Sequence, residues 1–77
     1  MKLTLKYHGR LTELFGKKEE TITVTSNTAE ALKQELEGLD IRFRENVYQL
    51  AQNNKIIKGN EILTAFDVDI FPPFSGG

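Results

Sequence analysis

Apolar and polar residues alternate at both ends of this chain, with the period of two expected of a half-buried strand. Near the start, Leu3, Leu5 and Tyr7 share one side of an extended segment, which predicts a strand over residues 2–7. Near the end, the same alternation predicts a strand over residues 67–71. Both strands are therefore expected to lie with one side against a core.

Shorter segments between these strands carry less regular patterns. Residues 10–15 predict a helical turn with apolar side chains facing inward, and Gly16 suits its C-terminal cap. Residues 21–25 are β-branched throughout and predict a strand antiparallel to the first. Residues 47–53 predict a third strand, and residues 55–58 predict a short edge strand whose lysines discourage pairing with other chains.

One main helix is predicted between the second and third strands. Asn27 is expected to cap it, Glu30 to complete a capping box, and Gly38 to end it. The apolar residues of this helix form a single stripe at helical spacing. They are Ala29, Leu32, Leu36 and Leu39. In the polar connection that follows, Ile41 and Phe43 are expected to tuck under the sheet.

The order strand, strand, helix, strand, short strand, strand predicts the fold class. One apolar stripe against one mixed sheet makes a two-layer α+β domain. The helix joins strands that cannot pair as a hairpin, so its crossover places the first and last strands as parallel neighbours at the sheet centre. This is the β-grasp arrangement, as in ubiquitin. We expect a β-grasp domain over residues 1–71 and a flexible, protruding tail over residues 72–77.

Size and charge exclude several classes of protein. A chain of 77 residues suits one small domain. Ten basic and eleven acidic residues give a net charge of −1 with no basic block, which disfavours nucleic-acid binding. No apolar run is long enough to span a membrane. The chain has no cysteine, which excludes disulfides and a cysteine nucleophile and fits a reducing cytoplasm.

The polar residues offer little built-in catalysis. His8 has no second histidine or cysteine to share a metal, so we expect a solvated or structural histidine and no metal site. Asp67 and Asp69 share one strand face and are expected to be solvated or to match the charge of a partner. Ser75 has no partner base and is not expected to act as a nucleophile.

The final six residues are the chemically distinctive stretch. Pro72 and Pro73 lack backbone N–H groups, so they end the last strand and favour a stiff extended conformation. Gly76 and Gly77 carry no side chain and can pass through a narrow channel. From Pro73 onward the segment could reach about 15 Å, presenting a bare carboxylate at Gly77. The alternative is a frayed terminus with no function.

Three aromatic residues near this end suggest a docking surface. Phe71 is expected on the strand face opposite the aliphatic residues, where it could form an apolar patch with Phe66 and Phe74. Exposed aromatic residues that cluster near a functional end often contact a partner. The alternative is burial under a loop, chiefly for Phe66.

The chain resembles a known family in several segments. Residues 71–77, Phe-Pro-Pro-Phe-Ser-Gly-Gly, resemble the F-P-P-x-x-G-G ending of the small subunit of molybdopterin synthase (MoaD type), in the wider MoaD/ThiS ubiquitin-like family. Residues 10–16, 29–32 and 51–53 resemble that family's R-E-L-x-G segment, helix start and A-V-N strand end. Residues 63–68 depart from it, because they lack the glycine of its L-x-D-G-D-E-V turn.

This resemblance implies a sulfur carrier that is not an enzyme on its own. An activating enzyme similar to ubiquitin E1 would use ATP to adenylate Gly77, and the adenylate would become a thiocarboxylate. The tail, including Gly76, would then enter the large (MoaE-type) subunit of a heterotetrameric molybdopterin synthase, which supplies the catalytic residues. The partner contacts implied are Phe66, Phe71, Pro72, Pro73, Phe74 and Ser75. No cofactor is expected to bind stably.

Three other functions stay open from the sequence. A thiamine-pathway carrier also ends in Gly-Gly, although it usually lacks the Pro-Pro pair. A ubiquitin-like modifier would join its C-terminal carboxylate to lysines of other proteins. A β-grasp interaction module would use the domain alone, with an inert tail.

Overall fold

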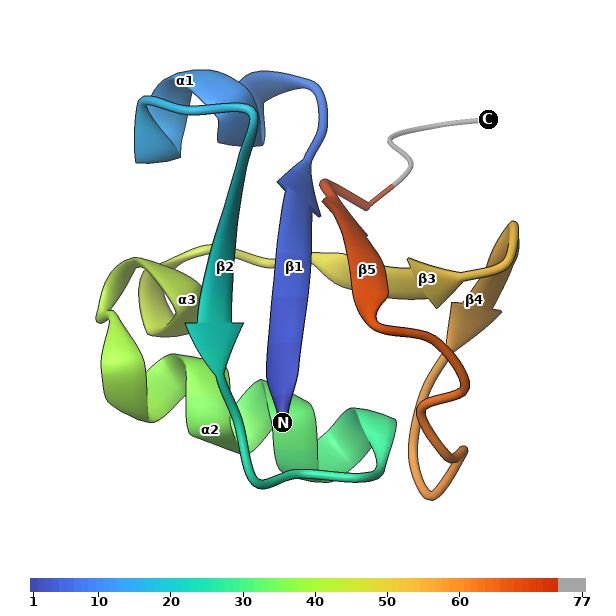
Figure 1. Cartoon of the computed structure of the whole chain (residues 1–77). Helices are drawn as coiled ribbons and strands as arrows, with labels where there is room; N and C mark the ends of the chain where they lie inside the picture. The colour runs from blue at the N-terminus through green and yellow to red at the C-terminus, as the bar shows by residue number, and fades with distance from the viewer. Residues whose placement is uncertain (74–77) are drawn as a thin grey trace.

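The computed structural model describes residues 1–73, and the elements follow the predicted order (Figure 1). They are β1 (Lys2–Tyr7), α1 (Arg10–Phe15), β2 (Glu19–Thr23), α2 (Ala29–Leu39), α3 (Arg42–Glu45), β3 (Gln49–Gln52), β4 (Lys55–Ile57) and β5 (Asp67–Phe71). One mixed sheet packs on α2, so the predicted two-layer α+β fold is confirmed.

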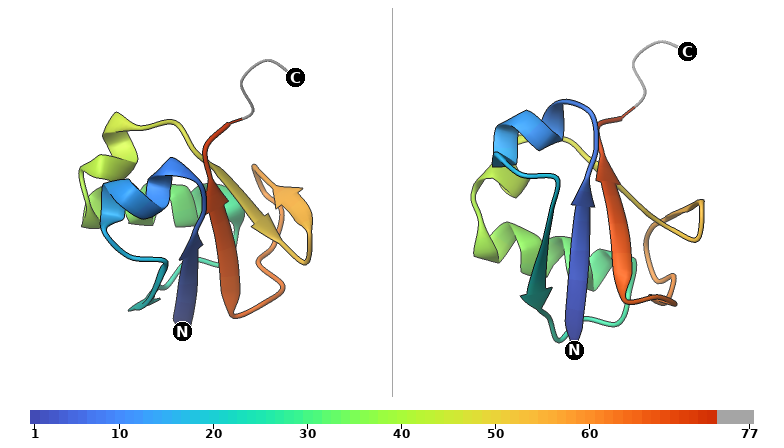
Figure 2. Two further views of the ribbon diagram at one scale, coloured as in Figure 1. Left: turned by 90° about the horizontal axis from the view of Figure 1, so that it is seen from above. Right: turned by 45° about the horizontal axis from the view of Figure 1, so that its top comes forward.

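Within residues 1–73, five strands form one sheet in the order β2-β1-β5-β3-β4. β1 and β5 run parallel at its centre, with Tyr7 opposite Ile70, as predicted. The other pairs are antiparallel. This is the β-grasp topology. Figure 2 shows that α1 and the end of β5 lie at the same end of the sheet.

The core lies between the sheet and the apolar stripe of α2. The alternation of β1 and β5 places their aliphatic residues on the buried face, as predicted. The largest fully buried side chains are Leu3, Leu5, Val24, Leu32, Leu36, Leu50, Val68 and Ile70. The predicted stripe is wrong at its last member, because Leu39 lies at the end of α2 and is 59% exposed.

The second strand begins and ends two residues earlier than predicted. Its register is set by β1, whose first residue, Lys2, already pairs with Thr23. Thr25 therefore has no strand residue opposite it. Instead the Thr25 and Ser26 N–H groups donate to the carboxylate of Glu35 on α2. These hydrogen bonds connect the loop before α2 to the helix.

The predicted N-cap of α2 is off by one residue. Thr28, in an extended conformation, caps the helix, and its Oγ1 accepts a hydrogen bond from the Ala31 N–H at 3.2 Å. Asn27 is held outside the helix, because its carbonyl accepts from the Leu63 N–H. The helix also runs through Gly38 and ends at Leu39.

The connection after α2 contains a short helix, α3, that the sequence pattern did not reveal. The Asp40 carboxylate accepts a hydrogen bond from the Arg42 N–H at 2.9 Å and pairs with the Arg42 guanidinium. This arrangement buries Phe43, as predicted, but leaves Ile41 61% exposed, so the prediction for Ile41 is wrong. The third strand is also shorter than predicted, since it begins at Gln49.

Candidate functional site

The candidate site is the place where the chain leaves the sheet. We call residues Phe71, Pro72 and Pro73 the exit segment. Phe71 is the last residue of β5, and all three residues are half-buried. The predicted tail residues Phe74, Ser75, Gly76 and Gly77 lie outside the described residues. The structure therefore places Pro72 and Pro73 directly after the end of a central strand.

The turn between β1 and α1 packs against the exit segment. We call His8 and Gly9 the exit turn. The His8 N–H donates to the Ile70 carbonyl at 2.9 Å, which extends the pairing of β1 with β5 by one bond. Gly9 adopts φ 58° and ψ −140°, a region that L-residues avoid. A Cβ atom on Gly9 would lie 3.4 Å from Pro72 Cγ. That distance is an ordinary van der Waals contact, so the φ and ψ of Gly9 are what require glycine, and the turn lies directly beside Pro72.

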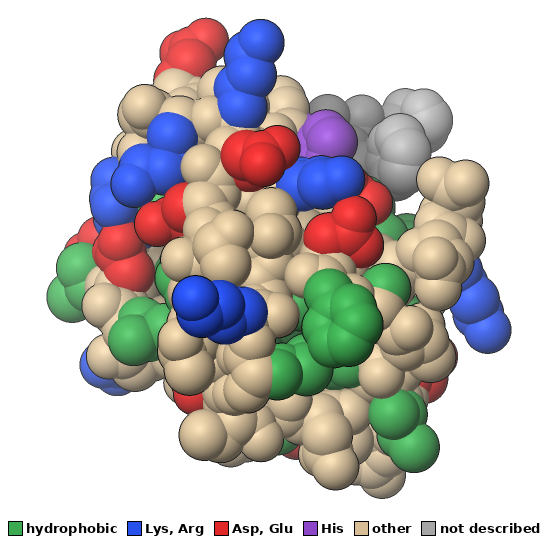
Figure 3. Space-filling model, viewed as in Figure 1, with side chains coloured by type: hydrophobic (Ala, Val, Ile, Leu, Met, Phe, Trp, Pro, Cys, Tyr) green, Lys and Arg blue, Asp and Glu red, His purple; other side chains and the backbone are tan. Residues whose placement is uncertain are grey.

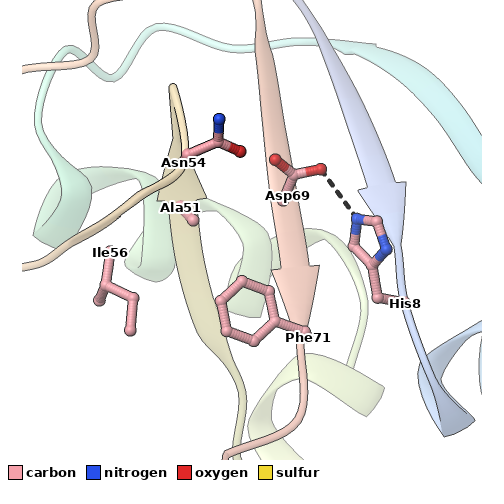
Figure 4. Close-up of a pocket in the computed structure, with 6 residues that line it drawn as sticks. All are labelled: His8, Ala51, Asn54, Ile56, Asp69 and Phe71. Atoms are coloured by element: carbon pink, nitrogen blue, oxygen red, sulfur yellow. Dashed lines mark hydrogen bonds and ion pairs between the residues drawn. The ribbon is translucent and has the colours of Figure 1, made fainter.

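The side chain of His8 is held by Asp69 on the open face of the sheet. Its Nε2 lies 2.8 Å from Asp69 Oδ1, and its ring meets the Phe71 ring edge-on, with centroids 6.4 Å apart (Figure 4). The His8 side chain is 50% exposed. The predicted solvated or structural histidine at a strand end is confirmed, since its side chain is half exposed and hydrogen-bonded to Asp69.

A pocket of about 380 Å³ adjoins this pair. His8, Asp69 and Phe71 line one side of it, and Ala51, Asn54 and Ile56 line the other. Figure 4 shows the Phe71 ring between the strand that carries Asp69 and the side chain of Ile56. The pocket thus has both polar and apolar side chains in its lining, and Phe71 of the exit segment is one of them.

Charged side chains gather on the rest of the open face (Figure 3). Lys6 Nζ lies 3.0 Å from Asp67 Oδ2, and this hydrogen bond raises the pKa of Lys6. Asp67 and Asp69 thus each pair with a side chain of the segment that contains β1 and the exit turn. Both carboxylates lie partly exposed on this face, which agrees with the predicted solvated face, and each has a partner within the chain. The alternative of a charge match to another protein stays a prediction.

The structure does not bring Phe66 and Phe71 together. Phe66 precedes β5 and Phe71 ends it, which separates them by about 16 Å along an extended strand. Phe66 is 76% exposed and borders the charged face near Lys6 and Asp67. Phe66 is therefore a separate exposed aromatic residue at the far end of β5, away from the exit segment.

Gln52 forms hydrogen bonds to the backbone of the loop before β5, which lies in the segment (residues 63–68) that lacks the glycine of the resembled turn. It is 2% exposed, and its Nε2 donates to the carbonyls of Ala65 and Asp67, while its Oε1 accepts from the Thr64 N–H. The sequence analysis missed this role. A polar residue at a core-facing position next to an Asn-Asn turn is the signal that could have revealed it.

The described residues contain no obvious catalytic or metal centre. In residues 1–73, no three His, Asp or Glu side chains converge to hold a metal ion. No helix in that part of the chain is long and apolar enough to cross a membrane. Within residues 1–73, the hydrogen bond between His8 and Asp69 orients the imidazole of His8.

Comparisons with known proteins agree with this arrangement. The profile of the ThiS family matches residues 5–77. A putative molybdopterin converting factor, subunit 1, from Pyrococcus furiosus has a similar structure, with a TM-score of 0.76 and 25% identity over 96% of this chain and 99% of that one. SAMP1 from Haloferax volcanii, 20% identical, has a TM-score of 0.72 over the full length of both chains, which shows the same fold. A search of curated proteins finds no match.

The fold and the comparisons together define a ubiquitin-like β-grasp protein of the MoaD/ThiS type. The chain belongs to the ThiS family.

Proposed function

We propose that this protein is a cytoplasmic sulfur carrier of molybdenum cofactor biosynthesis, and that its working group is the carboxylate of Gly77. The ThiS family match, which runs to residue 77, carries the proposal. The likeness to a protein titled molybdopterin converting factor, subunit 1, supports the choice of pathway. The Phe-Pro-Pro sequence at the end of β5 supports a tail that begins at residue 72.

The chemistry explains why such a carrier needs a partner enzyme. A carboxylate is a poor electrophile, so an activating enzyme must first join it to AMP from ATP, releasing pyrophosphate. A sulfide-level donor then attacks the acyl carbon, AMP leaves, and a thiocarboxylate remains. Its sulfur is a polarizable nucleophile, which the large subunit of molybdopterin synthase would direct at the molybdopterin precursor. Gly76 and Gly77 would let this group enter two different deep sites.

The fold suits the role of a handle. The exit segment continues from a central strand, which is hydrogen-bonded on both sides, to β1 and β3. The proposed partner contacts are Phe66, Phe71, Pro72, Pro73, Phe74 and Ser75. Of these, Phe71 lines the pocket beside the exit segment, and Phe66 would contact a different part of a partner. The large subunit would supply the catalytic residues.

Mass spectrometry tests the proposed chemistry. Incubation with an E1-like activating enzyme, ATP and a sulfur donor should raise the intact mass by about 16 Da, the exchange of one oxygen for sulfur. Two variants serve as controls, one lacking Gly77 and one with an alanine appended after it. Both should melt at the wild-type temperature and show no gain in mass. A gain in either variant would contradict the proposal.

Precursor specificity separates the related functions. The thiocarboxylated protein should pass sulfur to the molybdopterin precursor in the presence of the large subunit, and not to the thiamine-pathway precursor. Transfer to the thiamine precursor alone would make it a thiamine-type carrier. Isopeptide-linked adducts on lysines of other proteins, without sulfur transfer, would make it a modifier.

A further inference from the structure

We propose that Gly9 and His8, the exit turn, are positioning residues that fix the direction in which the chain leaves the sheet at Pro72. The inference concerns a contact between the first and last strands of the fold. Its structural part stands on the geometry of residues 1–73, and its consequence for activity rests on the proposed function.

The first observation is the close approach of Gly9 to Pro72. A Cβ atom at position 9 would lie 3.4 Å from Pro72 Cγ and 3.5 Å from Pro72 Cδ. At these distances the added atom would be in ordinary van der Waals contact with the proline ring, so the ring alone does not exclude it. Glycine is needed for the backbone, because L-residues avoid φ 58° with ψ −140°, and this conformation brings the exit turn next to Pro72.

The second observation is that the exit segment has no backbone N–H donor after Phe71. Proline has no N–H, so neither Pro72 nor Pro73 can donate a bond to a neighbouring strand. The last bond between the exit turn and β5 runs from the His8 N–H to the Ile70 carbonyl. At Pro72 and Pro73 only the carbonyl groups can take part in backbone pairing, so side-chain and ring contacts have a larger share in setting the direction of the chain.

The third observation is that His8 contacts the exit segment on the open face of the sheet. The 2.8 Å bond to Asp69 fixes the imidazole, whose edge packs on the Phe71 ring. The exit turn therefore contacts two successive residues, Phe71 through the His8 ring and Pro72 through the Gly9 backbone.

These contacts have a consequence for delivery of the tail. A tail that leaves in one direction loses less conformational freedom on entering a partner's channel than a tail that swings freely. Loosening the exit turn should therefore slow the reaction of a docked carrier, while docking through the rest of the surface should change little. In kinetic terms, kcat should fall and KM should stay nearly constant.

The chain offers a matched control for the glycine. Gly9 has φ 58° and Gly59 has φ 59°, but a Cβ atom at position 59 would meet nothing within 4 Å. Gly9→Ala and Gly59→Ala therefore each add a Cβ atom to a residue of positive φ, but only the atom at position 9 contacts Pro72. His8→Ala is a second variant, free of backbone strain. Its control is Lys6→Ala, which breaks the other β1–β5 ion pair without touching the exit segment.

Two measurements test the inference. One-bond Cα–Hα residual dipolar couplings of Pro72 and Pro73 report whether these residues share the alignment of the sheet. In the wild type and in both control variants, the couplings of Pro72 and Pro73 should fit the same alignment tensor as the couplings of the sheet. In Gly9→Ala and His8→Ala, the magnitude of these couplings should shrink. In thiocarboxylation assays with the activating enzyme, kcat should fall on the order of tenfold in Gly9→Ala, with KM within about twofold. His8→Ala should lower kcat in the same direction.

Two results would overturn the inference. One is a wild-type protein whose Pro72 and Pro73 couplings do not fit the sheet. The other is a result in which neither variant differs from its control. In that case Gly9→Ala would change the couplings and kcat no more than Gly59→Ala, and His8→Ala would change them no more than Lys6→Ala. If the wild type is never thiocarboxylated, the proposed function fails, and the couplings alone then decide whether the exit turn fixes the direction of the chain.

Discussion

Replacing Gln52 by leucine should destabilise the protein through the loop before β5. The buried amide of Gln52 makes three hydrogen bonds to the backbone of residues 64–67, at 2.8, 2.8 and 3.0 Å. Leucine has a similar volume, so the packing should change little. It has no polar atoms, so one N–H and two carbonyl groups would lose their partners.

The magnitude follows from these three bonds. Each intramolecular hydrogen bond contributes about 1 kcal/mol net, so their loss should lower the free energy of unfolding by about 3 kcal/mol. A chain of 77 residues has a total stability of roughly 4–12 kcal/mol. For a domain of this size, the loss corresponds to a fall of roughly 12–24 °C in melting temperature.

Urea unfolding followed by circular dichroism measures the loss, with Gln34→Leu as the control. Gln34 is an exposed residue of α2, so its replacement should change stability by less than about 0.5 kcal/mol. Hydrogen exchange adds a local readout, because the Thr64 N–H should lose its protection in Gln52→Leu. If Gln52→Leu costs no more than Gln34→Leu, the reasoning from buried hydrogen bonds is refuted.

Three further predictions follow from the structure. The hydrogen bond from Ser26 lowers the pKa of Glu35 below its ordinary value of 4.5, so the stabilisation is full above that pH and is lost as the pH falls through the lowered pKa. Urea titrations should thus show Glu35→Gln less stable by about 1 kcal/mol at pH 7, with the difference vanishing in acid; a constant difference would contradict this. Leu36→Ala, in the core, should lower the free energy of unfolding by about 2–5 kcal/mol. Leu39→Ala, on the same helix but exposed, should lower it by less than about 0.5 kcal/mol; equal losses in denaturant unfolding would contradict the packing described for α2. Phe71→Ala should weaken binding to the large synthase subunit by more than about 1 kcal/mol in calorimetry, and Leu39→Ala should leave the affinity unchanged; unchanged affinity in Phe71→Ala would remove Phe71 from the proposed interface.

The sequence predicted the fold because its strongest patterns lie in the elements that define the topology. β1 and β5 alternate cleanly, since each has one face on the core and one on solvent. A single helical stripe requires a single layer against the sheet. From these two facts the parallel central pair followed, and the register of Tyr7 with Ile70 bears it out.

Element boundaries were predicted less well, because contacts between distant segments decide them. β2 ends at Thr23 because only Met1 precedes Lys2, and Met1 exchanges the last hydrogen bonds of this pair with Val24. The helix cap moved from Asn27 to Thr28 because the bond to Leu63 holds Asn27 outside the helix. A local sequence pattern cannot predict such contacts, because the partner residues lie far away along the chain.

The candidate site was predicted in part for the same reason. The exit segment is visible in the sequence, since Pro72 and Pro73 have local effects on the backbone. Gly9 was not predicted to belong to the site, because its contact with Pro72 exists only after β1 and β5 pair. The pairing of His8 with Asp69 depends on the same register.

The central position of β5 also has a mechanical consequence. The two edge hairpins of the sheet, β1 with β2 and β3 with β4, are joined by β5 in the strand order. Tension applied between the N-terminus and the exit segment would pull β1 and β5 in opposite directions along their length, loading the hydrogen bonds between them in shear, all together, instead of opening them one by one. An unfoldase that grips the C-terminal end would meet this resistance first, and once it had extracted β5, the two halves of the sheet would separate.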